Sequence, residues 1–260
     1  MVIVIPVSAA DAKLVQPMLK VMEKLGPNGN HPAVIVSTPT AVVAAQQLHV
    51  GLQGLFASID LKVLVNEPQG GWPVACNIHF RETARLIFED PATGSHPWYW
   101  FELDNTPLKQ GWVDRLQSEY NAAGLPFMGY VHPTHFVSKY DEAGEPEEFI
   151  EQDKHMAGTG IYPNDLWTRS VMLHYMVQPF DVEMQCEIVP HCHATKLIQH
   201  NWSSGNYRRD KKSGKITCES LHPGRSPVDH ALPVSSDAVV LHGCKDGSLA
   251  EIVCRKRKLN

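Results

Sequence analysis

The chain has 260 residues, 43% of them hydrophobic, and a formal net charge of −5. This length and apolar content suffice to bury a full core, so they predict one α/β domain and exclude an intrinsically disordered chain. The negative charge argues against a protein whose whole surface binds nucleic acid, although local basic patches are compatible with it. The six cysteines form no Cys-x-x-Cys pair, which favours reduced thiols over a zinc ribbon.

No apolar run approaches the ~20 residues of a membrane span, and the amino terminus lacks the basic region and long apolar core of a secretion signal. We therefore expect a cytoplasmic protein without a membrane partner. The sequence gives no indication of its oligomeric state.

Strand and helix signals alternate through the first half of the chain. Predicted strands cover residues 2–7, 33–37, 61–65, 98–104 and 127–131, and predicted helices cover residues 8–25, 40–47, 77–88 and 112–120. The first strand is a continuous apolar run, as expected for a strand buried on both faces of a parallel sheet. The pattern predicts a mainly parallel, Rossmann-like sheet with helices on both faces, whose ligands bind beyond the carboxyl ends of the strands.

The second half is less regular. Seven acidic residues between positions 141 and 153 predict a solvated, mobile loop. The chain contains no internal repeat and no convincing domain boundary, so we expect residues 1–260 to form a single domain.

An apolar, aromatic strand that begins at Trp98 leads into Glu102 and Asp104. Alternate residues of a strand point to the same side, so the two carboxylates should share one face, and Pro107 should end the strand just beyond them. Two hard oxygen ligands at a strand end suit Mg or Mn, and those ions in turn suit a substrate diphosphate. An edge strand that ends in two solvated acids would have the same pattern.

In this context the segment resembles the A-type nucleotide-sugar glycosyltransferases, in which an acid-x-acid motif after a hydrophobic strand holds a divalent cation on the donor diphosphate. Leu108, Gly111 and Trp112 also match one branch of that family, where Pro-Leu precedes a Gly-Trp pair that opens a helix. The resemblance implies the GT-A fold, a Mn or Mg cofactor and a nucleotide sugar, most simply a UDP-sugar, as the donor. Many members carry Asp where this chain has Glu102, so Asp104 is the stronger candidate ligand.

The resemblance also implies the positions that bind the nucleotide, within residues 1–131. Pro6 and Val7 end the first strand at the ligand-binding edge, and Asn77 and Arg81 follow a Gly-Gly-Trp-Pro segment at a helix start. Backbone amides at a helix amino terminus and a nearby guanidinium group favour the binding of a phosphate group. A plain turn followed by a helix cap is the alternative interpretation.

Residues 132–260 would then form the acceptor side. The glycine-bearing segment 155–163 resembles the part of these enzymes where sugar and acceptor approach the backbone. Asp181 stands where inverting members keep the carboxylate that takes the proton from the acceptor hydroxyl. Glu183 and Glu187 compete for this role, and Asp181 could instead cap a helix.

His242 follows a late apolar strand and resembles the histidine that completes the metal shell, with Lys245 three residues on to neutralise the departing diphosphate. His200 also ends an apolar strand and is a rival for the same ligand position. The pair His191 and His193 could bind zinc, but no third and fourth ligand are evident in the sequence.

Two clusters of basic residues indicate which class of acceptor the protein could bind. One comprises Arg208, Arg209, Lys211, Lys212 and Lys215 around a predicted hairpin, and the other occupies residues 255–258. Such clusters suit a phosphate backbone. Together with the aromatic-acidic motif they resemble the small phage-type transferases that glycosylate hydroxymethylated pyrimidines in viral DNA.

The sequence thus predicts a hexosyl- or pentosyltransferase with DNA as a candidate acceptor, and a saccharide, lipid-linked or protein acceptor stays open. A non-catalytic nucleotide or nucleic-acid binding module on the same scaffold is the alternative. A two-metal phosphoesterase or nuclease fits less well, because such sites need more clustered Asp and His than the sequence offers.

Overall fold

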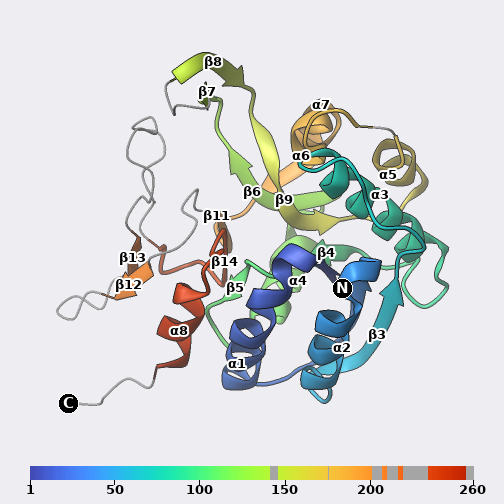
Figure 1. The fold of residues 1–260 in the computed structure, drawn as a ribbon, viewed down its shortest axis with the longest axis vertical. Coiled ribbons are helices and arrows are strands. Elements are labelled where there is room, and N and C mark those ends of the chain that lie inside the picture. The colour runs from blue at the N-terminus through green and yellow to red at the C-terminus, as the bar shows by residue number, and fades with distance from the viewer. Residues whose placement is uncertain (141–145, 175, 201–206, 210–215, 219–233, 256–260) are drawn as a thin grey trace.

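The computed structural model describes residues 1–140, 146–174, 176–200, 207–209, 216–218 and 234–255 (Figure 1). A seven-stranded sheet in the order β10-β6-β9-β4-β1-β2-β3 forms its centre. The strands are β1 (Val2–Val7), β2 (Asn28–Ser37), β3 (Phe56–Val63), β4 (Trp98–Trp100), β6 (Phe127–His132), β9 (His155–Tyr162) and β10 (Cys192–Ala194). Only β9 runs antiparallel to its neighbours, β4 and β6. The predicted mainly parallel, Rossmann-like sheet is confirmed.

Helices cover both faces of this sheet. They are α1 (Val15–Leu25), α2 (Val42–Gly51), α3 (Val74–Glu89), α4 (Trp112–Ala123), α5 (Leu166–Met172), α6 (Phe180–Glu183), α7 (Gln185–Ile188) and α8 (Ser248–Cys254), with short 3-10 helices η1 (Ala9–Leu14), η2 (Pro39–Ala41) and η3 (Val189–His191). Within the described part of the chain, no helix combines the length and the apolar character that crossing a bilayer requires.

Two hydrophobic cores form because alternate residues of β1 face opposite sides of the sheet. Ile3 and Ile5 pack in a core with residues of α1, α2 and α4. Val2 and Val4 pack in the other core, where α3, α5 and α6 contribute large side chains such as Phe80. Both sides of β1 are therefore buried, which explains why its sequence is apolar throughout.

The structure refines the predicted element boundaries. The helix expected from Ser8 is split into η1 and α1, and Pro17 falls in the first turn of α1, where a missing backbone N–H costs no hydrogen bond. Gly26 ends this helix with φ of 81°, as a glycine can. The third strand was expected at residues 61–65. It covers Phe56–Val63, and its pairing with β2 begins at Phe56.

The prediction of an acidic loop over residues 141–153 is partly wrong. Residues 146–152 form strand β8 (Pro146–Gln152), which pairs antiparallel with β7 (His135–Tyr140), while residues 141–145 lie outside the described part. The predicted basic hairpin is present as β12 (Tyr207–Arg209) and β13 (Ile216–Cys218). The prediction rested on the acidic composition of the segment, whereas strand formation here follows from pairing with the adjacent strand β7, which composition does not show.

A separate three-stranded sheet joins the carboxyl-terminal part of the chain to the segment after β4. Its strands are β11 (Ile198–His200), β14 (Val240–His242) and β5 (Thr106–Pro107), in that order. β14 is parallel to β11 and antiparallel to β5. Figure 1 shows these strands together, with α8 beside α1.

Gly158 in β9 lies under the ring of Phe180, which stacks on Phe80 with 3.8 Å between the ring centroids. A Cβ at Gly158 would come within 2.8 Å of the Phe180 ring, and a Cβ at Gly160 would meet Met156. These glycines therefore make room for side chains of the protein itself. Whether a sugar or an acceptor also approaches the backbone of this segment stays a prediction.

Gly158→Ala should destabilise the fold by about 1–3 kcal/mol, because the new methyl group forces Phe180 off its stacking partner. Gly29→Ala in β2 is the matched control, since nothing lies within 4 Å of its added Cβ. The control should change stability by no more than about 0.5 kcal/mol. Urea unfolding of both variants tests this, and equal midpoints would contradict it.

Candidate metal centre

Glu102 and Asp104 lie in a turn beyond the end of β4. The backbone carbonyl of Glu102 accepts hydrogen bonds from the backbone N–H of Asn105 (2.9 Å) and from its side-chain amide (3.0 Å). Asn105 in turn accepts a hydrogen bond from Thr159 in β9 at 3.1 Å. The prediction that the two acids share a strand face is therefore wrong, and a turn fixed by Asn105 sets their positions.

The two carboxylates nevertheless converge on His242. The ligand atoms of Glu102, Asp104 and His242 all lie within 4.8 Å of one another. His242 Nε2 is 3.1 Å from Glu102 Oε2 and 3.2 Å from Asp104 Oδ1. Among the residues that the structure describes, these are the one group of three or more His, Cys, Asp and Glu side chains placed to hold a metal ion.

Backbone and side-chain hydrogen bonds hold the three groups in place. The N–H of Cys244 donates to the carbonyl of Asp104 at 3.0 Å, which fixes the end of β14 against the turn. The indole N–H of Trp100 donates to Glu102 Oε1 at 2.8 Å and leaves Oε2 directed at His242. Residues from the middle of the sequence and from near its carboxyl end thus form one hydrogen-bonded cluster.

The electrostatics of the cluster suit a cation. Burial lowers the pKa of His242, but the carboxylates of Asp104 and Glu102 outweigh it and raise the pKa to about 10. Burial likewise raises the pKa of Asp104, but His242 outweighs it, and the net pKa is below the ordinary value. An imidazolium therefore sits between carboxylates in the metal-free protein.

The residues present fit a divalent metal. Asp104 is 6% exposed, and its Oδ1 makes no hydrogen bond of good geometry although it lies 3.2 Å from His242 Nε2. A buried carboxylate oxygen without such a bond is costly unless a cation or proton compensates it. Two carboxylates and one imidazole form a donor set that Mn accepts readily and Mg also tolerates.

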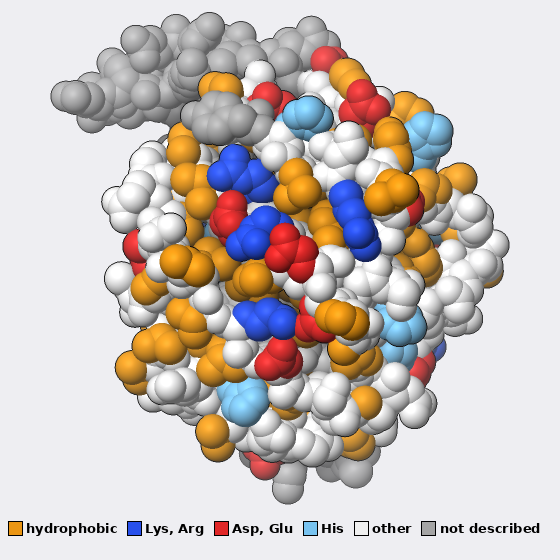
Figure 2. All heavy atoms as spheres, turned by 90° about the vertical axis from the view of Figure 1, so that its right-hand side faces the viewer, with side chains coloured by type: hydrophobic (Ala, Val, Ile, Leu, Met, Phe, Trp, Pro, Cys, Tyr) orange, Lys and Arg blue, Asp and Glu red, His pale blue; other side chains and the backbone are white. Residues whose placement is uncertain are grey.

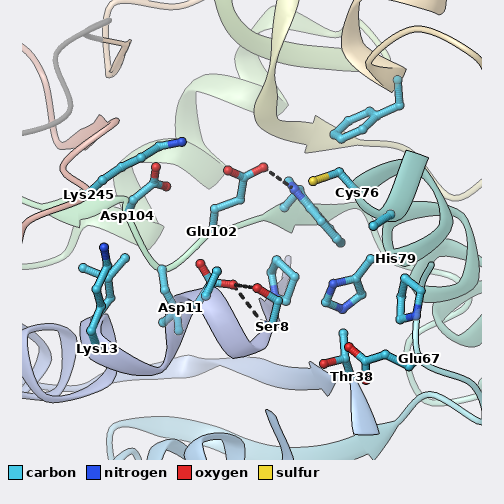
Figure 3. A pocket seen from close by; sticks show the side chains of 18 residues that line it. Ser8, Asp11, Lys13, Thr38, Glu67, Cys76, His79, Glu102, Asp104 and Lys245 are labelled. Atoms are coloured by element: carbon cyan, nitrogen blue, oxygen red, sulfur yellow. Dashed lines mark hydrogen bonds between the residues drawn. The ribbon is translucent and has the colours of Figure 1, made fainter. Parts of the chain in front are cut away.

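A cavity of about 370 Å³ adjoins the cluster at the carboxyl ends of β1 and β2. Figure 3 shows Glu102 and Asp104 on one side of it, with Lys245 beside Asp104 and Lys13 on the opposite side. Ser8, Thr38, Glu67, Cys76 and His79 line the part farther from Lys245. The cavity lies where a parallel sheet places its ligands.

The predicted nucleotide-binding residues separate into two groups. Pro6 and Lys245 line the cavity, whereas Val7 packs in the core. Asn77 donates to the carbonyls of Met176 and Gln178 and accepts from the N–H of Phe180, so its amide holds the 176–180 segment. Arg81 lies 3.5 Å from Glu82. The side chains of Val7, Asn77 and Arg81 do not line the cavity.

Sequence reasoning missed the contribution of η1. Ser8 donates from its backbone N–H (2.9 Å) and its hydroxyl (2.6 Å) to Asp11 Oδ2, and Asp11 and Lys13 both line the cavity. Burial raises the pKa of Asp11. The Ser8–Asp11 spacing was visible as a helix-start signal, but a capping signal does not tell which residues face a ligand.

The α3 residues at the cavity were also missed. His79 Nε2 lies 3.1 Å from the carbonyl of Val36, and burial lowers the pKa of this imidazole. Cys76 also lines the cavity, and its side chain is exposed. No sequence signal set these two residues apart from others on the helix.

Asp181 lies in α6, against Gly158 of β9. Its Oδ2 accepts a hydrogen bond from the Gly158 N–H at 3.1 Å, and burial raises its pKa. Glu183 accepts from the N–H groups of Val177 and Gln178 at 2.7 Å and is exposed, as is Glu187. Of the three rival carboxylates, Asp181 alone contacts the central sheet through such a bond in the described residues.

The other candidate histidines have partners. His200 lies directly behind His242, with 2.6 Å between the two Nδ1 atoms. His193 Nε2 is 3.0 Å from Glu119, and His191 packs edge-on against Trp167.

Most residues of the two basic clusters, 208–215 and 255–258, lie outside what the structure describes. Arg209 and Arg255 are exposed, and Arg255 pairs with Glu251 at 3.3 Å. The described part does not include the side chain of Arg208, nor Lys211, Lys212, Lys215 and residues 256–258. The face in Figure 2 intersperses acidic with basic side chains and thus offers no single-sign patch.

Binding of Mn²⁺ to this centre should release about one proton at pH 7. The raised pKa of about 10 means that His242 is protonated below that pH, so protons compete with the metal for Nε2. The apparent affinity should rise about tenfold per pH unit between pH 6.5 and 8. Calorimetric titration in buffers of different ionisation enthalpy measures this. His242→Gln should bind more weakly and release no proton, and a pH-independent affinity of the parent would contradict the assignment.

No protein-family model matches the sequence, and no curated protein matches it. Solved structures do match. The galactosyltransferase LgtC in complex with donor and acceptor sugar analogs is 12% identical, with 98% of this chain and 95% of that chain covered and a TM-score of 0.54. An active-site mutant of LgtC is also 12% identical, with 94% and 87% covered and a TM-score of 0.50. At this identity the likeness concerns the fold, and the chain has the fold of the A-type nucleotide-sugar glycosyltransferases.

Proposed function

We propose that the protein is a metal-dependent glycosyltransferase that moves a sugar from a nucleotide sugar, with a UDP-sugar as the favoured donor, to a hydroxyl group. The observation that carries this proposal is the convergence of Glu102, Asp104 and His242 beside a cavity at the carboxyl edge of the sheet. At about 370 Å³, the cavity falls within the range of small-molecule sites.

Glu102, Asp104 and His242 would hold a Mn or Mg ion. When bound, this ion supplies positive charge for the donor diphosphate. Lys245 lies beside Asp104 and adds a second positive charge for the diphosphate as it departs, and Lys13 adds a third from the opposite side of the cavity (Figure 3). The nucleoside would then bind near Asp11 and the β2 side of the cavity.

Asp181 is the proposed base. In the transfer, the bond from the sugar C1 to the diphosphate oxygen breaks, a bond from C1 to the acceptor oxygen forms, and the acceptor proton passes to the Asp181 carboxylate. This role implies inversion at C1. Burial raises the pKa of Asp181, which strengthens it as a base, while the Gly158 N–H fixes one of its oxygens.

The proposal for the acceptor rests on the amino-acid sequence. The two basic clusters support DNA that carries hydroxymethylated pyrimidines. A saccharide is the second candidate, because the galactosyltransferase that shares this fold was solved with an acceptor sugar analog. A module that binds nucleotides without transferring sugar would retain the cavity but hydrolyse no sugar nucleotide.

Asp104→Asn should lower Mn-dependent turnover by about 100-fold or more, beyond the usual loss for an outer-shell partner of a metal, while the fold is retained. The assay is hydrolysis of UDP-, GDP- and other sugar nucleotides with Mn, with and without hydroxymethylated DNA. Asp237→Asn, at an exposed position outside the cavity, is the matched control. Full activity of Asp104→Asn at ordinary Mn concentrations would refute the proposal.

Neutralising one basic cluster tests the acceptor. With glutamine at Arg208, Arg209, Lys211 and Lys212, DNA binding should weaken. The slope of log affinity against log salt should become shallower by about one for each DNA phosphate that the protein no longer neutralises. Hydrolysis of the sugar nucleotide without acceptor should survive. Exposed Lys20 and Lys24 on α1, changed to glutamine, provide the control.

If the parent neither binds DNA at low salt nor modifies it, the DNA acceptor is excluded, and the transferase proposal stands with a saccharide acceptor. If the quadruple variant binds and modifies DNA like the parent, the role of this basic cluster is refuted.

A further inference from the structure

His200 and His242 occupy adjacent positions on two parallel strands. β11 and β14 pair in a register that places His200 directly opposite His242. The two rings meet at an interplanar angle of 65°, with 4.5 Å between their centroids. Their Nδ1 atoms are 2.6 Å apart, which is hydrogen-bonding distance.

Such a contact requires one nitrogen to donate and the other to accept, so a single proton lies between the two rings. His242 Nε2 faces Glu102 and Asp104. An imidazole that binds a metal through Nε2 carries its remaining proton on Nδ1. His242 must then donate, and His200 must accept through an unprotonated Nδ1.

The surroundings of His200 favour this assignment. Its ring packs edge-on against His132, with 4.7 Å between centroids, and nearly parallel to Tyr130 at 6.2 Å. These ring contacts lie beside the contact in which His200 Nδ1 faces His242 Nδ1, the atom that carries the remaining proton when Nε2 binds the metal.

The opposite arrangement would block the metal. If His200 donated from Nδ1, a neutral His242 would carry its proton on Nε2, the atom that faces the carboxylates. The proton would then occupy the nitrogen that the cation needs.

We propose that His200 is a positioning residue that accepts the Nδ1 proton of His242 and so fixes the tautomer and ring orientation in which Nε2 faces the metal. This inference rests on the metal centre of the proposed function. It assigns distinct roles to the two histidines that competed for one ligand position in the sequence.

Two substitutions of His200 and one control at Tyr130 separate this role from packing. His200→Phe keeps a ring but removes the acceptor, and it should weaken Mn²⁺ binding by about 10- to 100-fold, as expected for loss of an outer-shell partner of a metal ligand. His200→Asn places an amide oxygen near the former Nδ1 position and should restore most of the affinity. Tyr130→Leu removes a ring that packs on His200 but spares the His200–His242 bond, and it should bind Mn²⁺ like the parent.

Binding of Mn²⁺ is measured directly, from the free-ion signal in electron paramagnetic resonance, with circular dichroism to verify folding. His200→Phe binding as tightly as the parent would overturn this inference alone. A parent protein that binds no Mn²⁺ would overturn the metal centre of the proposed function as well.

A second measurement uses the parent and does not depend on how the variants fold. In protein labelled with ¹⁵N-histidine, a nitrogen–nitrogen coupling across the hydrogen bond should connect the two Nδ1 atoms, with the proton attached to His242. The signals are assigned with His242→Gln. A proton attached to His200 Nδ1, or the absence of this coupling, would overturn the proposal.

Discussion

Two backbone hydrogen bonds hold the carboxyl-terminal strand β14 against the segment that follows β4. The Leu108 N–H donates to Val239 at 2.8 Å, and the Cys244 N–H donates to Asp104 at 3.0 Å. They bracket His242 and bring it to Glu102, from which it is 140 residues away in the sequence. Without this pairing the cavity would lose Lys245, and the carboxylates would face each other without a cationic partner.

The charge balance of the cluster depends on the same constraint. Two carboxylates so close together repel each other, and burial of Asp104 adds a desolvation cost. The His242 imidazolium offsets both effects when no metal is present, and it does so at the atom where the metal would bind. The protein can therefore fold with the site formed, and a cation then takes the place of a proton.

The sequence predicted those parts of the structure that follow from local chemistry. The apolar run of β1, buried on both faces, led correctly to a mainly parallel sheet, and the acid-x-acid motif with the late His242 named three groups that do meet. It did not give the turn at Glu102, because that turn depends on Asn105 and Thr159, which are 54 positions apart. Nor did it show that the Asn77 amide binds a backbone segment about a hundred residues away. Asp11 and Lys13 were missed because only the folded η1 shows which way its side chains face.

Helix α3 connects the cavity to the helix that carries Asp181. Cys76 and His79 line the cavity, while Asn77 and Phe80, on the same helix, hold α6 through the hydrogen bond to Phe180 and the stacked rings. The neighbour of Phe180 in α6 is Asp181. A shift of α3 would therefore displace that carboxylate as well. A redesign of the α3 wall of the cavity would have to leave Asn77 and Phe80 in place to preserve the position of Asp181.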